Sequence, residues 1–359
     1  MRTHMTTWLT LRVKKSIDLS MTVLGIETSC DECSAAVVRD GRDILSNVIA
    51  TQIELHKPYQ GVVPELASRL HTEWISQVVK AAISQAGLRN EDIDAVAVSN
   101  RPGLLGSLLV GVNFAKSFAY ALGIPVIGID HIRAHLYASQ IENPLEYPYL
   151  GVLVSGGHTV ICRVEGYDSI QVLGTTIDDA IGEAFDKVAK FYDLGYPGGV
   201  VIDRLSKSGD PMAFLFPGPT LDRGEHPYDM SYSGLKTGVI NQLDKFRNGD
   251  AQATPENIAA SFQRCAVGIL MKRVKAALKD TGLKRVSAGG GVAANSLLRS
   301  ELKALEQGGY TVTFPSLKLC TDNGAMVAGL AYRYLQDGFK DDLRLTASSR
   351  VAAFKHAYP

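Results

Sequence analysis

The chain has 359 residues, 46% hydrophobic and 21% charged, which is typical of a globular protein. Its length exceeds what one hydrophobic core usually organises, so two domains are expected. Lysine plus arginine equals aspartate plus glutamate at 37 each, which excludes capture of nucleic acid by bulk positive charge alone. The cysteines are odd in number and scattered, which indicates reduced thiols and a cytoplasmic location. They are Cys30, Cys33, Cys162, Cys265 and Cys320.

The first twenty residues, MRTHMTTWLTLRVKKSIDLS, carry no acid before Asp18 and no apolar stretch long enough for a secretory signal. They are interpreted as a leader upstream of Met21 or as a disordered tail, with an organelle-type presequence as the alternative. No run of about 18 apolar residues occurs, so no transmembrane helix is expected.

From Met21 the sequence TVLGIETSCDECSAAVVRDG predicts two strands around a small polar turn. Alternating helices and buried strands are expected to follow. They are a helix over 63–87, a strand over 93–99, a glycine-rich turn over 101–111, a helix over 113–123 and a strand over 125–130.

The second half opens in the same way, because YLGVLVSGGHTVICRVEG (149–166) predicts two strands around the turn Ser155, Gly156 and Gly157. The remainder is expected to contain a helix over 178–195, a Gly/Pro loop over 196–207, an irregular segment over 209–234, a helix over 255–282, a strand over 285–291, a helix from Val292, a strand over 310–316 and a helix over 322–334.

This alternation predicts an α/β protein. Two halves that each begin with a hairpin around a phosphate-sized turn predict a duplicated fold with a nucleotide between the halves. We expect an extension over residues 1–20, a first lobe over 21–146 and a second lobe over 147–359, with the chain crossing back near its C-terminal helix.

The run SAGGGVAANSLLR places three consecutive glycines between a strand and a helix. The backbone can therefore approach a ligand closely while the helix N-terminus offers free N–H groups to a phosphate or nucleoside. Its spacing matches neither GxGxxG nor a Walker loop. Asn295 at the helix start is expected either to cap the helix or to contact the nucleoside.

The turn SCDEC places Asp31 and Glu32 on a bend that is expected to face the glycine turn of the second half. Exposed turn carboxylates are common, so this pair has a purely structural alternative. Cys30 and Cys33 also spell CxxC, but SAAVV continues as a strand where a thioredoxin motif would start a helix, and a zinc site would need a second pair. We interpret the CxxC as a coincidence.

In IDHIRAH, His131 and His135 lie four residues apart and therefore on one face of a helix, which suits two ligands of one metal ion. Spacing alone does not separate this from capping or packing histidines. The peptidase motif HExxH has a glutamate, the general base, where Ile132 stands here. The sequence therefore does not support a peptidase of that type. A third ligand is supplied by Asp322 in LCTDNGAM, which has N-capping as its alternative role, and Cys320 is a rival ligand.

Together these residues resemble the TsaD family of tRNA adenosine threonylcarbamoyltransferases, a family once mistaken for O-sialoglycoprotein endopeptidases. The resemblance runs from about Met21 to at least Tyr334. It is carried by the ordered motifs GIETSCDE, VVPELASRLH, PGLLGSLLVG, HIRAH, LVSGGHT, AFDKVAK, YPGG, SYSGLKT, GGGVAAN and CTDNGAM.

The resemblance implies the fold shared by sugar kinases, heat-shock chaperone ATPases and actin. It implies transfer of threonylcarbamoyl from threonylcarbamoyl-adenylate to the exocyclic amine of the adenine 3′ of the anticodon, in tRNAs that read codons beginning with adenine, with release of AMP. In bacteria it implies two partners, the inactive paralogue TsaB and the ATPase TsaE. No membrane is involved.

Carried over by motif, the metal ligands are His131, His135 and Asp322, with iron as the expected ion and zinc as the alternative. Asp31 or Glu32 is the candidate base that receives the amine proton. The residues implied to bind the adenylate are Leu153, Val154, Ser155, Gly156, Gly157, Asp186, Gly199, Asp203 and Asn295.

Two positions depart from the family pattern, since Cys33 stands where threonine is usual and Arg101 where glycine is usual. Two other functions compete with the transferase: a non-catalytic scaffold of the same fold, which has no need of the histidines and Asp322, and a small-molecule kinase, which gives no reason for the histidines.

Overall fold

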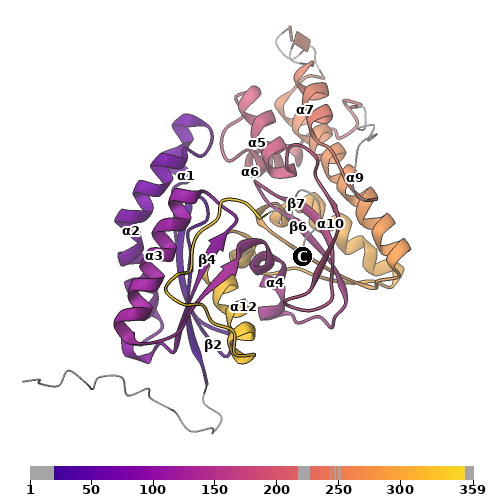
Figure 1. The fold of residues 1–359 in the computed structure, drawn as a ribbon. Coiled ribbons are helices and arrows are strands. Elements are labelled where there is room, and N and C mark those ends of the chain that lie inside the picture. Colours follow the sequence, from indigo (N-terminus) through magenta and orange to yellow (C-terminus); the bar gives the residue numbers. More distant parts are fainter. Residues whose placement is uncertain (1–19, 217–226, 243, 246–247, 250–251, 352–359) are drawn as a thin grey trace, which may run out of the picture.

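The computed structural model describes residues 20–216, 227–242, 244–245, 248–249 and 252–351. These residues form two lobes, each built on a five-stranded sheet (Figure 1). Apart from Ser20, the extension expected over residues 1–20 lies outside the described residues, and so does part of the segment expected to be irregular.

The first sheet has the strand order β3-β2-β1-β4-β5. Strand β1 is antiparallel to β2 and parallel to β4, and every residue of β1 is buried. Its strands are β1 (Thr22–Glu27), β2 (Glu32–Arg39), β3 (Asp43–Thr51), β4 (Ala95–Arg101) and β5 (Val126–Asp130).

The second sheet repeats this arrangement in the order β10-β9-β6-β7-β8. Strand β6 is antiparallel to β7 and parallel to β9, as β1 is to β2 and β4. The predicted duplicated α/β fold is therefore confirmed. Its strands are β6 (Tyr149–Val154), β7 (Thr159–Val164), β8 (Ile170–Thr175), β9 (Arg285–Gly289) and β10 (Thr311–Thr313).

Alternate residues of β1 face opposite layers, as the two-residue period of a strand requires. Leu24 and Ile26 pack against α2 and α3, whereas Val23 packs against α4 and α12. The elements of this lobe are α1 (Ile53–His56), η1 (Lys57–Tyr59), α2 (Pro64–Gln85), η2 (Asn90–Asp92), α3 (Leu105–Leu122), α4 (His131–Glu142) and α12 (Gly324–Gln336).

The predicted glycine-rich turn over 101–111 is wrong in its second half, because α3 already begins at Leu105. By length and composition alone, α3 is the one described helix that is long and apolar enough to cross a membrane. It packs within the lobe against α2 and β4, as the core helix of a globular protein also does.

Helices of the second lobe cover its sheet, and most of its buried side chains form one cluster with them. The expected loop over 196–207 is wrong, because α6 occupies most of it. Asp186 stabilises the start of α6 by accepting a hydrogen bond from Gly198 N at 2.7 Å. The elements are α5 (Ile181–Phe191), α6 (Gly198–Ser206), α7 (Ser233–Ile240), α9 (Pro255–Thr281), η3 (Gly291–Ala294), α10 (Ser296–Lys303), η4 (Ala304–Gly308) and α11 (Leu317–Cys320).

Helix α12 follows the second sheet in sequence but packs on β1 and β2 of the first lobe (Figure 1). The crossing is close, because a Cβ at Gly25 would lie 2.1 Å from Gly324 O and 2.7 Å from Ala328 N. Only glycine at position 25 allows this approach. It places Asp322, two residues before α12, at the carboxyl end of β1.

We predict that Gly25→Ala destabilises the protein by about 2–4 kcal/mol, because the added methyl group meets backbone atoms that cannot move aside. The free energy of unfolding in urea measures this change. Gly268→Ala is the control: no heavy atom lies within 4 Å of its Cβ position in α9, so a gain of about 0.5–1 kcal/mol is expected. Equal stability of Gly25→Ala and the parent would show that the crossing is not rigid.

Candidate functional site

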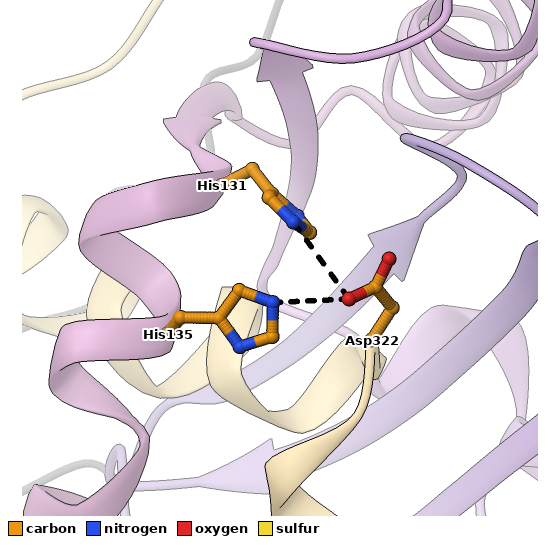
Figure 2. Close-up of side chains that lie close together, drawn as sticks. All are labelled: His131, His135 and Asp322. Atoms are coloured by element: carbon orange, nitrogen blue, oxygen red, sulfur yellow. Dashed lines mark hydrogen bonds and ion pairs between the residues drawn. The ribbon is translucent and has the colours of Figure 1, made fainter. Parts of the chain in front are cut away.

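His131, His135 and Asp322 come together between α4 and the start of α12 (Figure 2). His135 Nε2 lies 3.0 Å and His131 Nε2 lies 3.7 Å from Asp322 Oδ1. Their potential ligand atoms all lie within 4.8 Å of one another. Two imidazole nitrogens and one carboxylate oxygen at this separation can hold a divalent metal ion.

Glu27 supports this cluster from the end of β1. Its side chain is completely buried, and Oε2 lies 3.1 Å from His131 Nδ1. An ionised carboxylate can only accept, so His131 Nδ1 carries a proton and donates it to Glu27, and Nε2 is the ring nitrogen that faces Asp322 and is available to a metal ion. Ser99 Oγ donates to the same Glu27 oxygen, and Ser29 Oγ lies 3.1 Å from His131 Nδ1.

Charge balance in the cluster follows from these contacts. Burial alone would lower the pKa of His131, but Glu27 and Asp322 raise it to about 9. Burial opposes ionisation of Asp322, yet His131 and His135 hold its pKa well below the ordinary value. The pKa of Glu27 is likewise lowered, because the charge and hydrogen bond of His131 outweigh burial. The carboxylates of Glu27 and Asp322 therefore stabilise a positive charge between them. A bound metal ion would need the same stabilisation.

Cys320 does not belong to the described cluster. Its Sγ lies 3.8 Å from Pro315 O and accepts a contact from Arg299 Nη2 at 3.4 Å. Asp322 also does not cap α12, because Asn323 accepts the hydrogen bond from Met326 N instead. Of the alternatives left open by the sequence, the geometry therefore favours Asp322 over Cys320 as a ligand.

The acidic turn lies at the same end of the first sheet. Asp31 is buried, and its charge reaches Asp186 and Tyr196 of the second lobe, where it contributes to raised pKa values. Burial, followed by the charges of Asp31 and Asp322, raises the pKa of Glu32 well above its ordinary value. The charges of both candidate acids therefore act on Tyr196, a residue of the second lobe.

The glycine turn of the second lobe closes β6 and lies next to the histidines. Ser155 N donates to His158 O at 2.8 Å, and no heavy atom lies within 4 Å of a Cβ position at Gly156 or Gly157. Leu153 and Val154 are completely buried in β6. The turn thus leaves open space beside backbone N–H groups, which suits an anionic ligand.

The triple glycine lets β9 approach both β6 and α4. A Cβ at Gly290, whose φ is +91°, would lie 2.3 Å from Val154 O. A Cβ at Gly289 would lie 2.5 Å from His135 O. The glycines therefore join the helix of the histidines to the strand that ends in the glycine turn.

The other residues expected to bind the adenylate also stabilise helix ends. Asp203 Oδ1 accepts from Ser296 N at 3.0 Å, and Asn295 caps α10 by accepting from Leu298 N at 3.0 Å. Asp186 holds Gly198 N, as described above, while a Cβ position at Gly199 faces open space. Their contact with a nucleotide stays a prediction, and the capping role proposed for Asn295 is observed.

Two residues of the site were not singled out from the sequence. Glu27 ends an otherwise apolar strand, and an isolated carboxylate in such a run is the signal that identifies it. His158 follows the glycine turn. Burial, then the charges of His131 and His135, lowers its pKa to about 3, so a neutral imidazole borders the cluster.

Comparison with known proteins agrees with this description. Among solved structures, HypF from T.kodakarensis superposes with a TM-score of 0.60 at 15% identity, over 89% of this chain and 48% of that one. Component A of (R)-2-hydroxyglutaryl-CoA dehydratase from Acidaminococcus fermentans gives 0.54 at 15% identity, over 88% of this chain and all of that one. The fold is thus the two-lobed α/β fold of the actin-like ATPases and sugar kinases, here with a metal-binding type of cluster between the lobes.

The family is shown by closer relatives. The profile of the TsaD family, tRNA N6-adenosine threonylcarbamoyltransferase, matches residues 43–329. A protein of that name from Treponema denticola is 60% identical over 93% of this chain and 98% of its own length, and one from Borrelia duttonii is 50% identical over 94% and 98%. The chain belongs to the TsaD family, and it is a transferase that modifies adenosine in tRNA.

We predict a pH-dependent stability difference between the parent and Asp186→Asn. Burial raises the pKa of Asp186 from 3.8 to about 6, so the folded state holds this proton more tightly than the unfolded state. As pH rises from about 4 to about 6, the parent should lose stability relative to Asp186→Asn, on the order of 2–3 kcal/mol. Urea unfolding at several pH values measures this difference, and parallel profiles of the two proteins would contradict it.

We predict that Glu27→Gln weakens metal binding about 10- to 100-fold, because an amide holds the His131 Nδ1 proton less strongly and no longer balances the charge of the ion. Competition with a chromophoric chelator, using added Fe²⁺ or Zn²⁺, measures the affinity. The control is Glu32→Gln, which alters a nearby, partly exposed acid for which no contact with the histidines is observed. Equal affinities for Glu27→Gln and the parent would exclude this positioning role.

Proposed function

We propose that the chain transfers the threonylcarbamoyl group from threonylcarbamoyl-adenylate to the exocyclic amine of the adenine 3′ of the anticodon. The acceptors are tRNAs that read codons beginning with adenine, and AMP is released. The observation that carries this proposal is the adjacency of two features, the His131, His135 and Asp322 cluster and the open glycine turn at Gly156 and Gly157. One suits a cation and the other a nucleotide phosphate.

The metal would be held by His131, His135 and Asp322, with iron as the first candidate and zinc as the second. When bound, such an ion supplies Lewis-acid stabilisation of the charge that develops on the carbonyl or phosphate oxygens. The chain's own part is orientation: Glu27 fixes the tautomer and ring position of His131, and Gly289 lets α4 pack directly against β9.

The second lobe would bind the adenylate. The adenylate would bind along Leu153 to Gly157, where buried Leu153 and Val154 hold the turn in place and open space lies at the Cβ positions of Gly156 and Gly157. Gly199 leaves room at the start of α6. Asp186, Asp203 and Asn295 keep the N-termini of α6 and α10 in place. The donor is a mixed anhydride that already carries its leaving group, so binding and orientation suffice and ATP hydrolysis is not needed in this step.

In the transfer, the adenine amine nitrogen forms a bond to the carbamoyl carbon, and the bond from that carbon to the phosphate oxygen of AMP breaks. The amine must lose a proton. We assign this proton to Glu32 or Asp31, whose charges act on Tyr196 of the second lobe. No covalent enzyme intermediate is required.

We propose that TsaB and TsaE assist this chain in bacteria. The net charge of zero gives the chain little bulk attraction for tRNA. In addition, none of the exposed residues of α3 is charged; they are Leu105, Gly106, Leu109, Asn113, Ser117, Tyr120 and Ala121. Such an uncharged helix face fits a protein partner of the same fold.

We predict that the chain, combined with TsaB, TsaE, threonylcarbamoyl-adenylate and an unmodified tRNA, produces threonylcarbamoyladenosine. Mass spectrometry of the digested tRNA detects it. Asp322→Asn should reduce kcat by at least about 100-fold and lower the bound metal, since one ligand loses its charge. A tRNA with guanosine in place of the acceptor adenosine is the negative control.

The two competing functions give different outcomes in the same assay. A non-catalytic scaffold would give no product in any partner combination and equal metal content in the parent and Asp322→Asn. A small-molecule kinase would consume ATP with a sugar or acid acceptor and be indifferent to the histidines.

A further inference from the structure

Arg101 belongs to the first lobe and lies beside Asp130, the residue that precedes His131. It ends β4, and 54% of its side chain is exposed. Its Nε lies 3.6 Å from Asp130 Oδ2, whose side chain is only 3% exposed. Asp130 Oδ1 caps α4 by accepting from Ile132 N and Arg133 N, so the Arg101 guanidinium lies at the start of the helix that carries both histidines.

The C-terminal strap, defined here as residues 341–351, brings a second arginine near the same helix. Asp341 N donates to Val126 O at 2.9 Å, which places the start of the strap on the free edge of β5. Farther along, Asn100 Nδ2 donates to Thr346 O at 3.1 Å and Ser348 N donates to Asn100 O at 2.9 Å. The strap therefore passes directly beside Arg101.

Beyond Ser348 the strap crosses toward the second lobe (Figure 1). Val351 packs against the hydrophobic cluster that contains Ile132 of α4 and Leu153 of β6. Arg350 is exposed and stands between these two anchor points, Asn100 in the first lobe and the Ile132–Leu153 cluster. Two arginines from distant parts of the sequence thus lie near α4: Arg101 beside its N-capping Asp130, and Arg350 next to Val351, which packs against the cluster that contains Ile132.

Arg101 and Arg350 have few ion-pair partners, in contrast to the paired charges of Glu27, His131 and Asp322. Among the described residues, Arg101 pairs only with Asp130, and Arg350 has no ion-pair partner. The neighbouring acid Asp342 is already bound by Arg344 at 2.6 Å. An arginine side chain has five N–H donors, so Arg101 can keep its contact with Asp130 and still bind a second anion.

The acceptor tRNA is the ligand that fits these two arginines. The proposed acceptor adenine is flanked by backbone phosphates, and exposed arginines near α4 are the groups that would meet them. The proposed adenylate site lies in the second lobe, where the glycine turn would bind the adenylate phosphate. The arginines of the first lobe and the strap are therefore not needed for that phosphate. A chain of zero net charge has to hold a polyanion by local contacts of this kind.

We propose that Arg101 and Arg350 form a phosphate-binding rim that holds the backbone of the anticodon loop next to the acceptor adenine. This inference deepens the proposed function, on which it rests, by naming the surface that meets tRNA. The strap is then part of the binding site, and its hydrogen bonds to Asn100 fix the position of one phosphate contact relative to the other.

The primary test is equilibrium binding of fluorescently labelled, unmodified tRNA to the chain with TsaB and TsaE, measured by anisotropy at several salt concentrations. Arg101→Ala and Arg350→Ala should each weaken binding about 5- to 20-fold and lower the slope of log K against log salt by about 0.7 per lost contact. Arg344→Ala is the matched control on the same strap, since its guanidinium is held by Asp342, and it should bind tRNA like the parent.

Steady-state kinetics separates this role from a structural one. Both variants should raise KM for tRNA while kcat, KM for threonylcarbamoyl-adenylate and metal content stay unchanged. Arg350→Ala leaves the Arg101–Asp130 pair intact, so its effect cannot arise from the α4 cap. Unchanged tRNA affinity in both variants, or a raised KM for the adenylate alone, would overturn the proposal. If the parent makes no modified nucleoside, the proposed function fails. The binding assay still shows whether Arg101 and Arg350 bind tRNA.

Discussion

The close crossing of α12 over β1 is the constraint on which the site depends. Glycines at positions 25 and 324 let the helix backbone approach the strand backbone, with a Cβ at Gly25 only 2.1 Å from Gly324 O. Because α12 follows the second sheet, this crossing returns the chain to the first lobe and delivers Asp322 to His131 and His135. The cluster of His131, His135 and Asp322 therefore requires α12 to pack on the first sheet.

The two lobes contribute different chemistry to the candidate site. In the first lobe, opposite charges balance one another, since buried Glu27 and His131 form an ion pair and the partly buried Asp322 faces both histidines. In the second lobe, the carboxylates stabilise helix ends and the glycine turn leaves open backbone. One lobe thus suits a cation and the other an anion, which is what the proposed acyl-adenylate donor would require of its binding site.

Local patterns predicted the elements well where one face was clearly buried and poorly elsewhere. The paired hairpins, the long helices and the buried strands were recognised, whereas β3 and β8 were not, because these half-exposed strands carry mixed patterns. The segment 196–207 was expected to be a loop because of its Gly and Pro residues. It forms α6, since Pro197 precedes the first turn and Asp186, distant in sequence, holds Gly198 N.

The sequence by itself determined the family, the duplicated α/β fold and the residue types of the site. Ordered motifs and the regular spacing of apolar residues can be recognised without knowledge of the tertiary structure. Only the tertiary structure decided which groups meet. It brought Asp322 to the histidines and turned Cys320 away, placed Glu27 behind His131, and laid the C-terminal strap beside Arg101. These contacts join residues up to hundreds of positions apart, and their geometry follows from packing and buried charge, which no local pattern encodes.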